Sequence, residues 1–442
     1  MIKLQEYLNS HEISEIHPSD IAKILKTLDD NDFSAAVKLV PKDLIGDVAL
    51  ALPDRLFDDV VESLTVDELS HAVTELESDD QADFMHELEE IDHAIASEVF
   101  ETLDEEDQKE IIKLHNYEED EAGAYMQLEV FTAYKSEIVQ DVIRRFAKLR
   151  KENELENVQN LFITNEENRL RYRVGLDDLL IFDFSKTLKE NIESSDDSFE
   201  PKVAQDREDI KEVVHYFEEY DLSVMPIVNT YGILVGRITS DDIYDIINEH
   251  ATEQMYNLAG VDDEAEEDDE ILKAARTRAT WLGLNLFTAI VASLVVALFS
   301  DTLESMVALA VLMPIVASMG GNAGTQSLTV VVRQLALGDI SQGDAMRIIK
   351  KEVTISLGNG FLFAIVTGII ASLWFNMGML GVVIALSMVI NLFMAGFFGA
   401  TIPLFLKKMD IDPAIGSTVI LTTVTDVVGF FSFLGLATYI LL

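Results

Sequence analysis

Four long apolar blocks in the C-terminal third of this chain limit its possible folds more than any other feature. The blocks are Ala279–Ser300, Ser305–Val332, Val353–Leu406 and Pro413–Leu442, and the last is uncharged except for Asp426. A bilayer core of about 30 Å requires roughly 20 helical residues, so three of the blocks predict one span each. The third block has 54 residues with Asn376-Met377-Gly378 in its middle, and it predicts two spans. We therefore expect a transmembrane domain of five helices.

Asp426 is an acid near the centre of the fifth predicted span. Such a residue costs at least about 2.5–3.5 kcal/mol on insertion scales unless it faces water, an ion or a partner. Thr418 and Thr422 precede it at intervals of four residues, so the three share one helix face, with Thr425 and Gly429 beside it. This polar stripe indicates an ion path. A proton relay, or an acid held by a hydroxyl group, is the alternative.

The second predicted span contains Pro314 followed by Gly320-Gly321-Asn322. This pattern predicts a helix that is broken at membrane depth, which is tolerated only inside protein or along a watery cavity. Gly320, Gly321 and Gly324 also permit close helix packing, so a plain kinked packing helix is the alternative. Together with the stripe, the break favours a pore. Its predicted lining is Pro314, Gly320, Gly321, Asn322, Thr418 and Thr425.

The charge of the chain is concentrated in its first 270 residues. Net charge is −47 overall, and residues 1–270 hold 71 acidic and 23 basic residues. Such a surface attracts cations and argues against nucleic acid as a partner. The chain has no cysteine, and its predicted spans contain no histidine, which argues against a site built for zinc or copper.

Basic residues flank the predicted spans on one side of the membrane only. They are Lys273, Arg276 and Arg278 before the first span, Arg333, Arg347, Lys350 and Lys351 between the second and third, and Lys407 and Lys408 before the fifth. The positive-inside rule therefore predicts a cytoplasmic acidic half and an outside C-terminus. The N-terminus has no apolar signal region, so we expect a multi-pass protein of the cell membrane, embedded in the lipid bilayer, whose N-terminal domains are cytoplasmic.

Residues 1–116 carry a 12-residue apolar period and short polar turns. The period comprises Leu28, Val40, Leu52, Leu64, Leu76 and Leu88. Units of this size must stack to bury an apolar face, so we expect an α-helical superhelical N-domain. Its acids are either a solvated surface or part of regulatory cation sites.

Residues 117–250 alternate between strand and helix patterns and predict two small α/β modules in tandem. The predicted strands are Glu129–Tyr134, Val158–Ile163, Ser223–Val228 and Ile233–Thr239, and the predicted helices are Ile138–Lys151, Arg207–Tyr220 and Asp241–Glu249.

The second module ends in Gly236-Arg-Ile-Thr-Ser-Asp-Asp242 and resembles the closing motif of a CBS domain. The resemblance implies that Thr239 and Asp242 can hold the ribose of an adenine nucleotide such as ATP. In the first module, Gly175 stands where the hydroxyl is expected, although Asp178 remains. A CBS pair that serves as a dimer hinge without nucleotide is the alternative we favour.

Residues 251–278 join the acidic half to the first predicted span and include the acidic run Asp263–Glu270. They predict a connecting helix at the membrane surface, although a solvated linker is also consistent with the run. The sequence thus predicts four parts, which are residues 1–116, 117–250, 251–278 and 279–442.

The whole arrangement resembles the MgtE family of magnesium channels. The matching motifs are Pro314 with Gly320–Ser327, Ala251–Glu253 leading to Ala259–Val261, and Asp412–Ala414 followed by Thr425–Gly429. The resemblance implies a homodimer with a pore on its two-fold axis, lined by the second and fifth spans. It also implies that residues 251–278 form a plug helix, which gates the pore in response to cytoplasmic Mg²⁺.

The resemblance also assigns residue roles. Asp426 is implied as the selectivity acid, and the Thr422 carbonyl helps to receive the hydrated ion. The implied cation-sensing acids are Asp242, Asp245, Glu253 and Asp412; His250 and Gln254 stand where acids are common, which weakens the expected gating.

Mg²⁺ dehydrates reluctantly and is usually held by one or two carboxylates through retained waters, which suits two facing Asp426 side chains. Mn²⁺ and Co²⁺ share octahedral oxygen coordination and are alternative ions. A non-conducting membrane sensor with CBS domains is a further alternative. We do not expect an enzyme, because the spans carry no Ser/His pair and no His-Glu-x-x-His motif.

Overall fold

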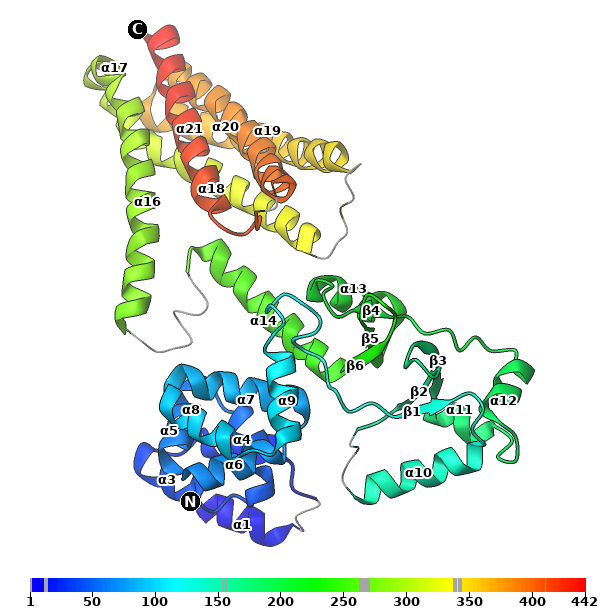
Figure 1. The fold of residues 1–442 in the computed structure, drawn as a ribbon. Helices are drawn as coiled ribbons and strands as arrows, with labels where there is room; N and C mark the ends of the chain where they lie inside the picture. The colour runs from blue at the N-terminus through cyan, green and yellow to red at the C-terminus, as the bar shows by residue number, and fades with distance from the viewer. Residues whose placement is uncertain are drawn as a thin grey trace. The chain divides into compact units, whose positions relative to one another are not determined.

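The computed structural model describes residues 2–11, 15–152, 155, 157–261, 271–336, 340, 344–409 and 411–442, which form two compact units (Figure 1). We call Met1–Glu249 the acidic unit and His250–Leu442 the membrane unit. The predicted acidic run Asp263–Glu270 lies outside the described residues.

The acidic unit begins with short helices that stack around one apolar core, as the superhelical N-domain prediction requires. They are α1 (Ile2–Ser10), α2 (Pro18–Leu25), α3 (Asp30–Val37), η2 (Lys42–Leu44), α4 (Ile45–Leu50), α5 (Asp54–Ser63), α6 (Val66–Thr74), α7 (Ser78–Ile91), α8 (His93–Thr102) and α9 (Glu105–Leu114).

The 12-residue period corresponds to one short helix and the turn that follows it. Val40, Leu52 and Leu76 lie just after α3, α4 and α6, and each is at most 7% exposed. Leu28 and Leu64 pack against the same core. The last member of the period, at position 88, is buried inside α7, because α7 is longer than the others at 14 residues.

Two three-stranded sheets follow, one in each α/β module. The first contains β1 (Thr132–Tyr134), β2 (Asn160–Thr164) and β3 (Leu170–Gly175), and the second contains β4 (Ala204–Gln205), β5 (Val224–Val228) and β6 (Leu234–Thr239). In each sheet the first pair of strands is parallel and the second is antiparallel. The accompanying helices are α10 (Val139–Lys151), α11 (Leu176–Ile181), α12 (Leu188–Ser194) and α13 (Ile210–Tyr220).

All the strands and helices predicted for the two modules overlap observed elements, whereas β3, β4, α11 and α12 were not predicted. Their patterns are weak for physical reasons. Strand β3 has exposed or half-exposed residues at five of its six positions, so it lacks an apolar period. Strand β4 has only two residues.

The segment between α9 and β1 runs along the second module before the chain enters the first. The backbones of Gln127 and Arg237 exchange hydrogen bonds of 2.7 and 2.9 Å. Beside them, the Ser78 hydroxyl at the start of α7 donates to Glu129 at 2.8 Å. These contacts hold α7 of the N-domain next to the second module.

Helix α14 (Ser240–Ala259) starts directly after β6 and continues past residue 250, where the sequence predicted a boundary. Its first turn is capped by Asp242, whose carboxylate accepts hydrogen bonds from the Thr239 backbone at 3.2 Å and from the Thr239 hydroxyl at 2.7 Å.

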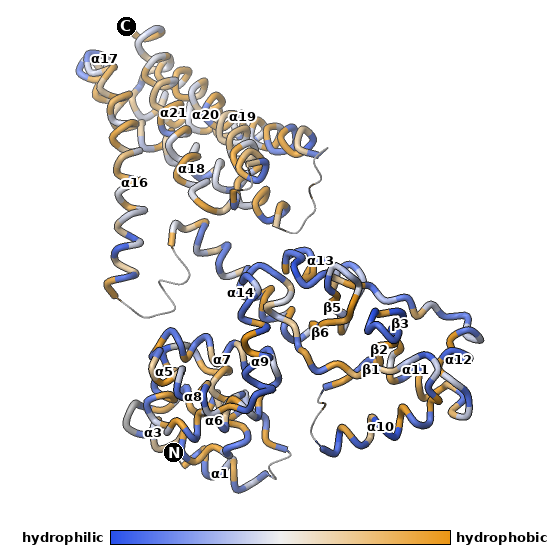
Figure 2. The backbone as a smooth tube through the Cα atoms, viewed as in Figure 1, coloured by the Kyte–Doolittle hydropathy of each residue, from blue (hydrophilic) through white to orange (hydrophobic). Residues whose placement is uncertain are grey.

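Among its described residues, the membrane unit contains five helices that are long and apolar enough to span a bilayer, which agrees with the predicted number. They are α16 (Ile271–Ala297), α18 (Val307–Ala336), α19 (Ala345–Phe375), α20 (Gly378–Lys408) and α21 (Ser417–Leu441), and the short helix α17 (Ser300–Ser305) follows the first. Figure 2 shows their mostly apolar residues. Helix α20 packs against α18, α19 and α21 (Figure 1).

The predicted break between the third and fourth spans is confirmed. Asn376 ends α19 in a left-handed conformation with φ of 55°, and α20 begins at Gly378.

The predicted break in the second span is wrong, because α18 is one continuous helix through Pro314 and both glycines. Every backbone amide in lipid must find a partner within the protein, which favours an unbroken helix. Two of its glycines serve packing instead: Gly320 faces Asn391 of α20, and Gly324 faces Leu421 of α21.

The third span begins earlier than its uncharged block. Helix α19 starts at Ala345, eight residues before the predicted start, and therefore includes Glu352. Asp426 is thus not the only acid within the candidate span helices, because a charge near a helix end does not end the helix.

Candidate functional site

Asp426 is the tenth residue of α21 and is half-buried within a single chain. Its carboxylate has no hydrogen-bond or ion-pair partner among the described residues. The Thr422 hydroxyl one turn earlier donates to the backbone carbonyls of Thr418 and Val419, at 2.9 and 3.1 Å. That hydroxyl is satisfied within its own helix, so Asp426 remains the unpartnered polar group of the stripe.

Thr425 lies on another face of α21 than Asp426. Its side chain is fully buried, and its hydroxyl donates to the carbonyls of Leu421 and Thr422 at 3.1 Å each. The Thr422 carbonyl expected to receive the ion therefore already accepts a hydroxyl in this structure.

The residues predicted to line the pore from α18 fall on two faces. The predicted Pro314 and Asn322 recur every four residues with Ser318, which was not predicted, and all three are exposed on a single chain; the Asn322 amide lies 3.3 Å from the Ser318 hydroxyl. Gly320 is buried against α20, whereas a Cβ at Gly321 would meet nothing within 4 Å. Only part of the predicted set thus shares the exposed polar face.

Glu352 is a buried acid of the membrane unit that the sequence analysis did not select. It is 5% exposed, and it accepts a hydrogen bond of 2.7 Å from the Ser327 hydroxyl of α18. Gly396 and Gly399 of α20 let the backbones approach here, and a Cβ at Gly399 would lie 2.8 Å from the Gly324 carbonyl. The sequence feature that could have identified Glu352 is a charged residue near the start of a long apolar helix.

The end of α14 lies against the start of α21 within the membrane unit. The Thr418 hydroxyl donates to the Leu258 carbonyl at 3.0 Å, and Leu258 packs against the apolar cluster that includes Ala414 and Leu421. The first residue of the predicted polar stripe is therefore bonded to the segment that was predicted to gate it.

The two predicted sensing acids of the membrane unit make local contacts. Asp412 accepts a backbone bond from Ala414 at 2.7 Å, in the turn before α21. Glu253 accepts from Asn257 at 3.4 Å within α14.

In the acidic unit, three aspartates of α7 lie close to Asp242 of α14. Burial, then the neighbouring acids Asp83 and Asp242, raises the pKa of Asp80 to about 7. Burial raises the pKa of Asp83 to about 6, with Asp242 and Glu249 adding to the effect of burial and His86 opposing it. Burial also raises the pKa of Asp79 well above its usual range.

Asp242 itself has a pKa raised to about 6, chiefly by burial, although its hydrogen bonds from Thr239 act in the opposite direction. We call Asp79, Asp80, Asp83 and Asp242 the acidic cluster. The sequence analysis found only the last of these, because nothing in an acidic helical repeat marks which acids another domain will cover. The predicted Asp245 is exposed one turn further along α14.

No three Asp, Glu or His side chains among the described residues are grouped closely enough to share one metal ion. A hydrated Mg²⁺ does not require such a group, because one or two carboxylates hold it through water. The acidic cluster therefore suits hydrated cations, or protons, rather than a fully coordinated ion.

The two residues of the predicted nucleotide site, Thr239 and Asp242, are hydrogen-bonded to each other. Thr239 is 6% exposed and its hydroxyl bonds to Asp242, so a bound ribose would have to replace that bond. At Gly175 in the first module, the backbone donates to Asp178 at 3.3 Å. ATP binding at Thr239 and Asp242 stays a prediction.

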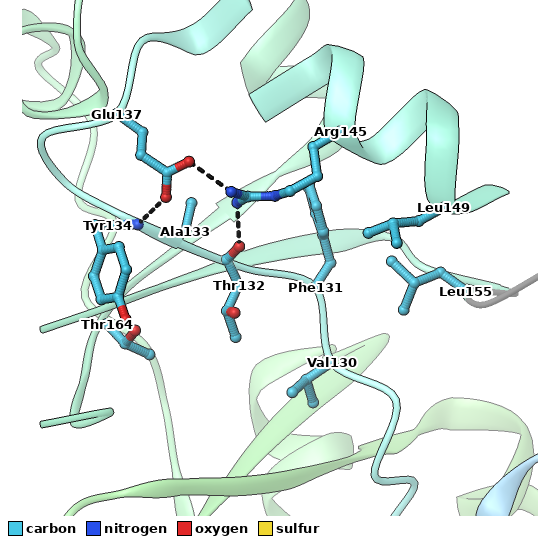
Figure 3. A pocket seen from close by; sticks show the side chains of 10 residues that line it. All are labelled: Val130, Phe131, Thr132, Ala133, Tyr134, Glu137, Arg145, Leu149, Leu155 and Thr164. Carbon is cyan, nitrogen blue, oxygen red and sulfur yellow. Dashed lines mark hydrogen bonds and ion pairs between the residues drawn. The ribbon is translucent and has the colours of Figure 1, made fainter. Parts of the chain in front are cut away.

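A cavity of about 290 Å³ lies in the first module, and neither Thr239 nor Asp242 lines it (Figure 3). Arg145 of α10 reaches into it and bonds to Glu137 at 2.7 Å and to the Thr132 carbonyl at 2.6 Å. These bonds satisfy the arginine within the protein. Its lining is Val130, Phe131, Thr132, Ala133, Tyr134, Glu137, Arg145, Leu149, Leu155 and Thr164.

Comparison with known proteins decides the family. Residues 313–436 match the MgtE model of a divalent cation transporter, and residues 16–120 match the MgtE intracellular N domain. Over 339 residues the chain is 32% identical to the magnesium transporter MgtE of Thermus thermophilus, which covers 75% of this chain and 72% of that protein. The chain belongs to the MgtE family of magnesium transporters.

Other MgtE proteins are similarly related. The magnesium transporter MgtE of Bacillus subtilis is 30% identical over 334 residues, which is 75% of this chain and 72% of that protein. A crystal structure of the cytosolic domain of the Mg²⁺ channel MgtE in complex with ATP is 27% identical, with a TM-score of 0.49. It covers 55% of this chain and 99% of that one.

Family membership places the chain in the membrane as a multi-pass MgtE protein with an intracellular N-terminal domain. A CBS domain model matches residues 198–249, which contain the strands of the second α/β module and the whole predicted motif Gly236–Asp242. The MgtE relatives are named as transporters and not as enzymes.

Proposed function

We propose that this MgtE chain admits hydrated Mg²⁺ through a pore on the axis of a homodimer, and that cytoplasmic Mg²⁺ gates the pore. The observation that carries the proposal is the Asp426 carboxylate, which has no partner among the described residues of a membrane helix. An acid there is costly unless it meets water or an ion. Two such carboxylates across a dimer axis match the one or two that Mg²⁺ uses through retained waters.

The exposed face of α18 supports the same path. Pro314, Ser318 and Asn322 lie on the side of the helix that the rest of its own chain leaves uncovered. An amide and a hydroxyl on that face offer oxygen atoms to a hydrated ion. In the proposal this face and the Asp426 face line the pore, while Gly320 and Thr425 support it from inside the bundle.

The acidic cluster supports gating by cytoplasmic cations. Neighbouring carboxylates that the protein partly desolvates repel one another, and bound protons or cations relieve that repulsion. In the proposal, Mg²⁺ neutralises the acidic cluster and holds the N-domain against the second CBS module. Asp245, Glu253 and Asp412 provide further sites along the same route, and Leu258 of α14 reaches Thr418 at its end.

Mg²⁺ flux into proteoliposomes tests the path. We expect Asp426→Asn to reduce Mg²⁺ flux by about 100- to 20,000-fold, because an interaction with a charged group is worth about 1.5–3 kcal/mol and a dimer loses two. Asp301→Asn, an exposed acid of α17, is the matched control and should conduct normally.

Wild-type Mg²⁺ flux in Asp426→Asn would remove the pore assignment. The same assay with Mn²⁺ and Co²⁺ separates a magnesium path from a broader divalent one. A wild-type protein without flux of any of these ions would instead support a non-conducting sensor.

A further inference from the structure

Helix α20 carries a fully buried amide in its middle. Asn391 is the 14th of the 31 residues of α20 and is 0% exposed. Polar side chains at such a depth in a membrane protein generally face the bundle interior and mark functional positions. Asn391 belongs neither to the polar stripe of α21 nor to the exposed face of α18, so the ion path described above does not account for it.

One side of this amide contacts α18. Asn391 Nδ2 donates to the Val316 carbonyl at 2.8 Å, and Val316 lies two residues after Pro314. The amide occupies the space that a side chain at Gly320 would need, and a Cβ there would lie 2.9 Å from Asn391 Oδ1. Gly320 is therefore the residue that makes room for the amide on α18.

The same amide contacts α21. A Cβ at Gly429 would lie 2.8 Å from Asn391 Nδ2 and 3.2 Å from Asn391 Cγ. Gly429 is one helical turn from Asp426, and Gly320 is two residues from Asn322. A single side chain of α20 thus lies between the two helices of the proposed path, within about one turn of a path residue on each.

Stability alone does not explain an amide at this place. Its Oδ1 atom is buried and has no hydrogen-bond partner among the described residues. The Val316 carbonyl is inside a helix and has an intrahelical partner of its own. A leucine of similar shape would avoid burying an unpaired oxygen, and it would leave the Val316 carbonyl with its intrahelical partner, so no buried polar group would lose its only bond.

We propose that Asn391 is a positioning residue that fixes the register of α18 against α21. It thereby aligns Asn322, on the exposed face of α18, with Asp426 of α21. This inference rests on the proposed ion path. The hydrogen bond to Val316 is directional and sets the height of α18, whereas apolar contacts alone permit sliding. The two glycines let both helices approach the amide closely.

Asn391→Leu tests the role, because it keeps the approximate shape and removes the donor. We expect unchanged or higher thermal stability, with the Mg²⁺ half-saturation concentration raised and the preference for Mg²⁺ over Ca²⁺ reduced. The expected size is about threefold to twentyfold, the range that one membrane hydrogen bond supplies. Gly358→Ala of α19, whose Cβ would meet nothing within 4 Å, is the matched control.

A double variant separates positioning from simple packing. Gly320→Ala crowds the amide, and Gly320→Ala with Asn391→Ala removes both the crowding and the hydrogen bond. We expect the double variant to recover assembly and thermal stability but not half-saturation or selectivity. Recovery of both would overturn the inference, since packing would then be sufficient. Where Asn391→Leu does not assemble, Asn391→Ala and the double variant take its place.

The outcome is distinguishable from a failure of the ion path itself. Normal half-saturation and selectivity in Asn391→Leu, together with an inactive Asp426→Asn, overturn only the positioning role. A fully active Asp426→Asn overturns the path and the inference that rests on it.

Discussion

The carboxylates singled out in the acidic unit are clustered, whereas those of the membrane unit are isolated from one another. In the acidic unit, three aspartates of α7 lie close to Asp242, and desolvation by the surrounding protein raises their pKa values, although only Asp79 is fully buried. In the membrane unit, Asp426 has no partner among the described residues, and Glu352 bonds to the single hydroxyl of Ser327.

Solvent explains the difference. Protons and cations reach a cluster at the boundary of two water-exposed domains, so repulsion there can be switched on and off. Within a bilayer each charge must be neutralised locally or face water. A cluster of carboxylates therefore suits a cation sensor, and an isolated carboxylate suits an ion path. The comparison predicts that cations stabilise the acidic unit, and that the acids of the membrane unit change conduction or packing.

The largest expected effect concerns cation binding to the acidic cluster. Removing Mg²⁺ from the wild-type protein in detergent at pH 7.5 should lower its unfolding temperature. The stabilisation lost is about 2.7 kcal/mol at an ion concentration 100-fold above the dissociation constant. A variant with Asn at positions 80, 83 and 242 should lose most of this Mg²⁺ dependence. An equal Mg²⁺ response in both proteins would contradict the cluster as a cation site.

The second effect is the pH dependence of Asp80. Its pKa is raised from 3.8 to about 7, so the folded state binds the proton more tightly than the unfolded state. Without divalent ions, its contribution to stability is therefore complete below about pH 4 and is lost as pH rises to about 7. Asp80→Asn removes this loss.

Thermal unfolding from pH 5 to 7.5 without divalent ions measures the Asp80 effect. The unfolding temperature of Asp80→Asn should exceed that of wild type by about 4 °C or more near pH 7, and by less at pH 5. Asp196→Asn, an exposed aspartate of the same unit, is the control and should show no such trend. A constant difference across this range would show that the Asp80 carboxyl is not the titrating group.

The smallest effect concerns Glu352. Glu352→Leu removes the acceptor of the Ser327 hydroxyl in the contact between α18 and α19. Membrane hydrogen bonds average about 0.6 kcal/mol and reach about 1.7 kcal/mol, so we expect a loss of about 1 kcal/mol in thermal stability, measured in detergent. Glu352→Gln keeps an acceptor and should lose less. A strong loss of Mg²⁺ flux without loss of stability would instead make Glu352 part of the path.

The sequence by itself determined the membrane helices of this protein, the stacked helices of its N-domain and most elements of its two α/β modules. The apolar blocks predicted five membrane helices and the turn at Asn376, because a bilayer requires a minimum length of apolar helix. The 12-residue period predicted stacked short helices, since each unit must bury one face. The sequence also located Asp426, because one acid in an apolar helix is conspicuous.

Only the tertiary structure decided which polar residues meet. Asp80 and Asp83 look like any other acids of the repeat, and only the fold brings them close to Asp242. Gly320 reads as a helix breaker in sequence but lies in a continuous helix, where it makes room for Asn391 of α20. The local sequence pattern determines whether a segment lies in water or in lipid. Contacts between distant segments arise from packing, which no single segment encodes.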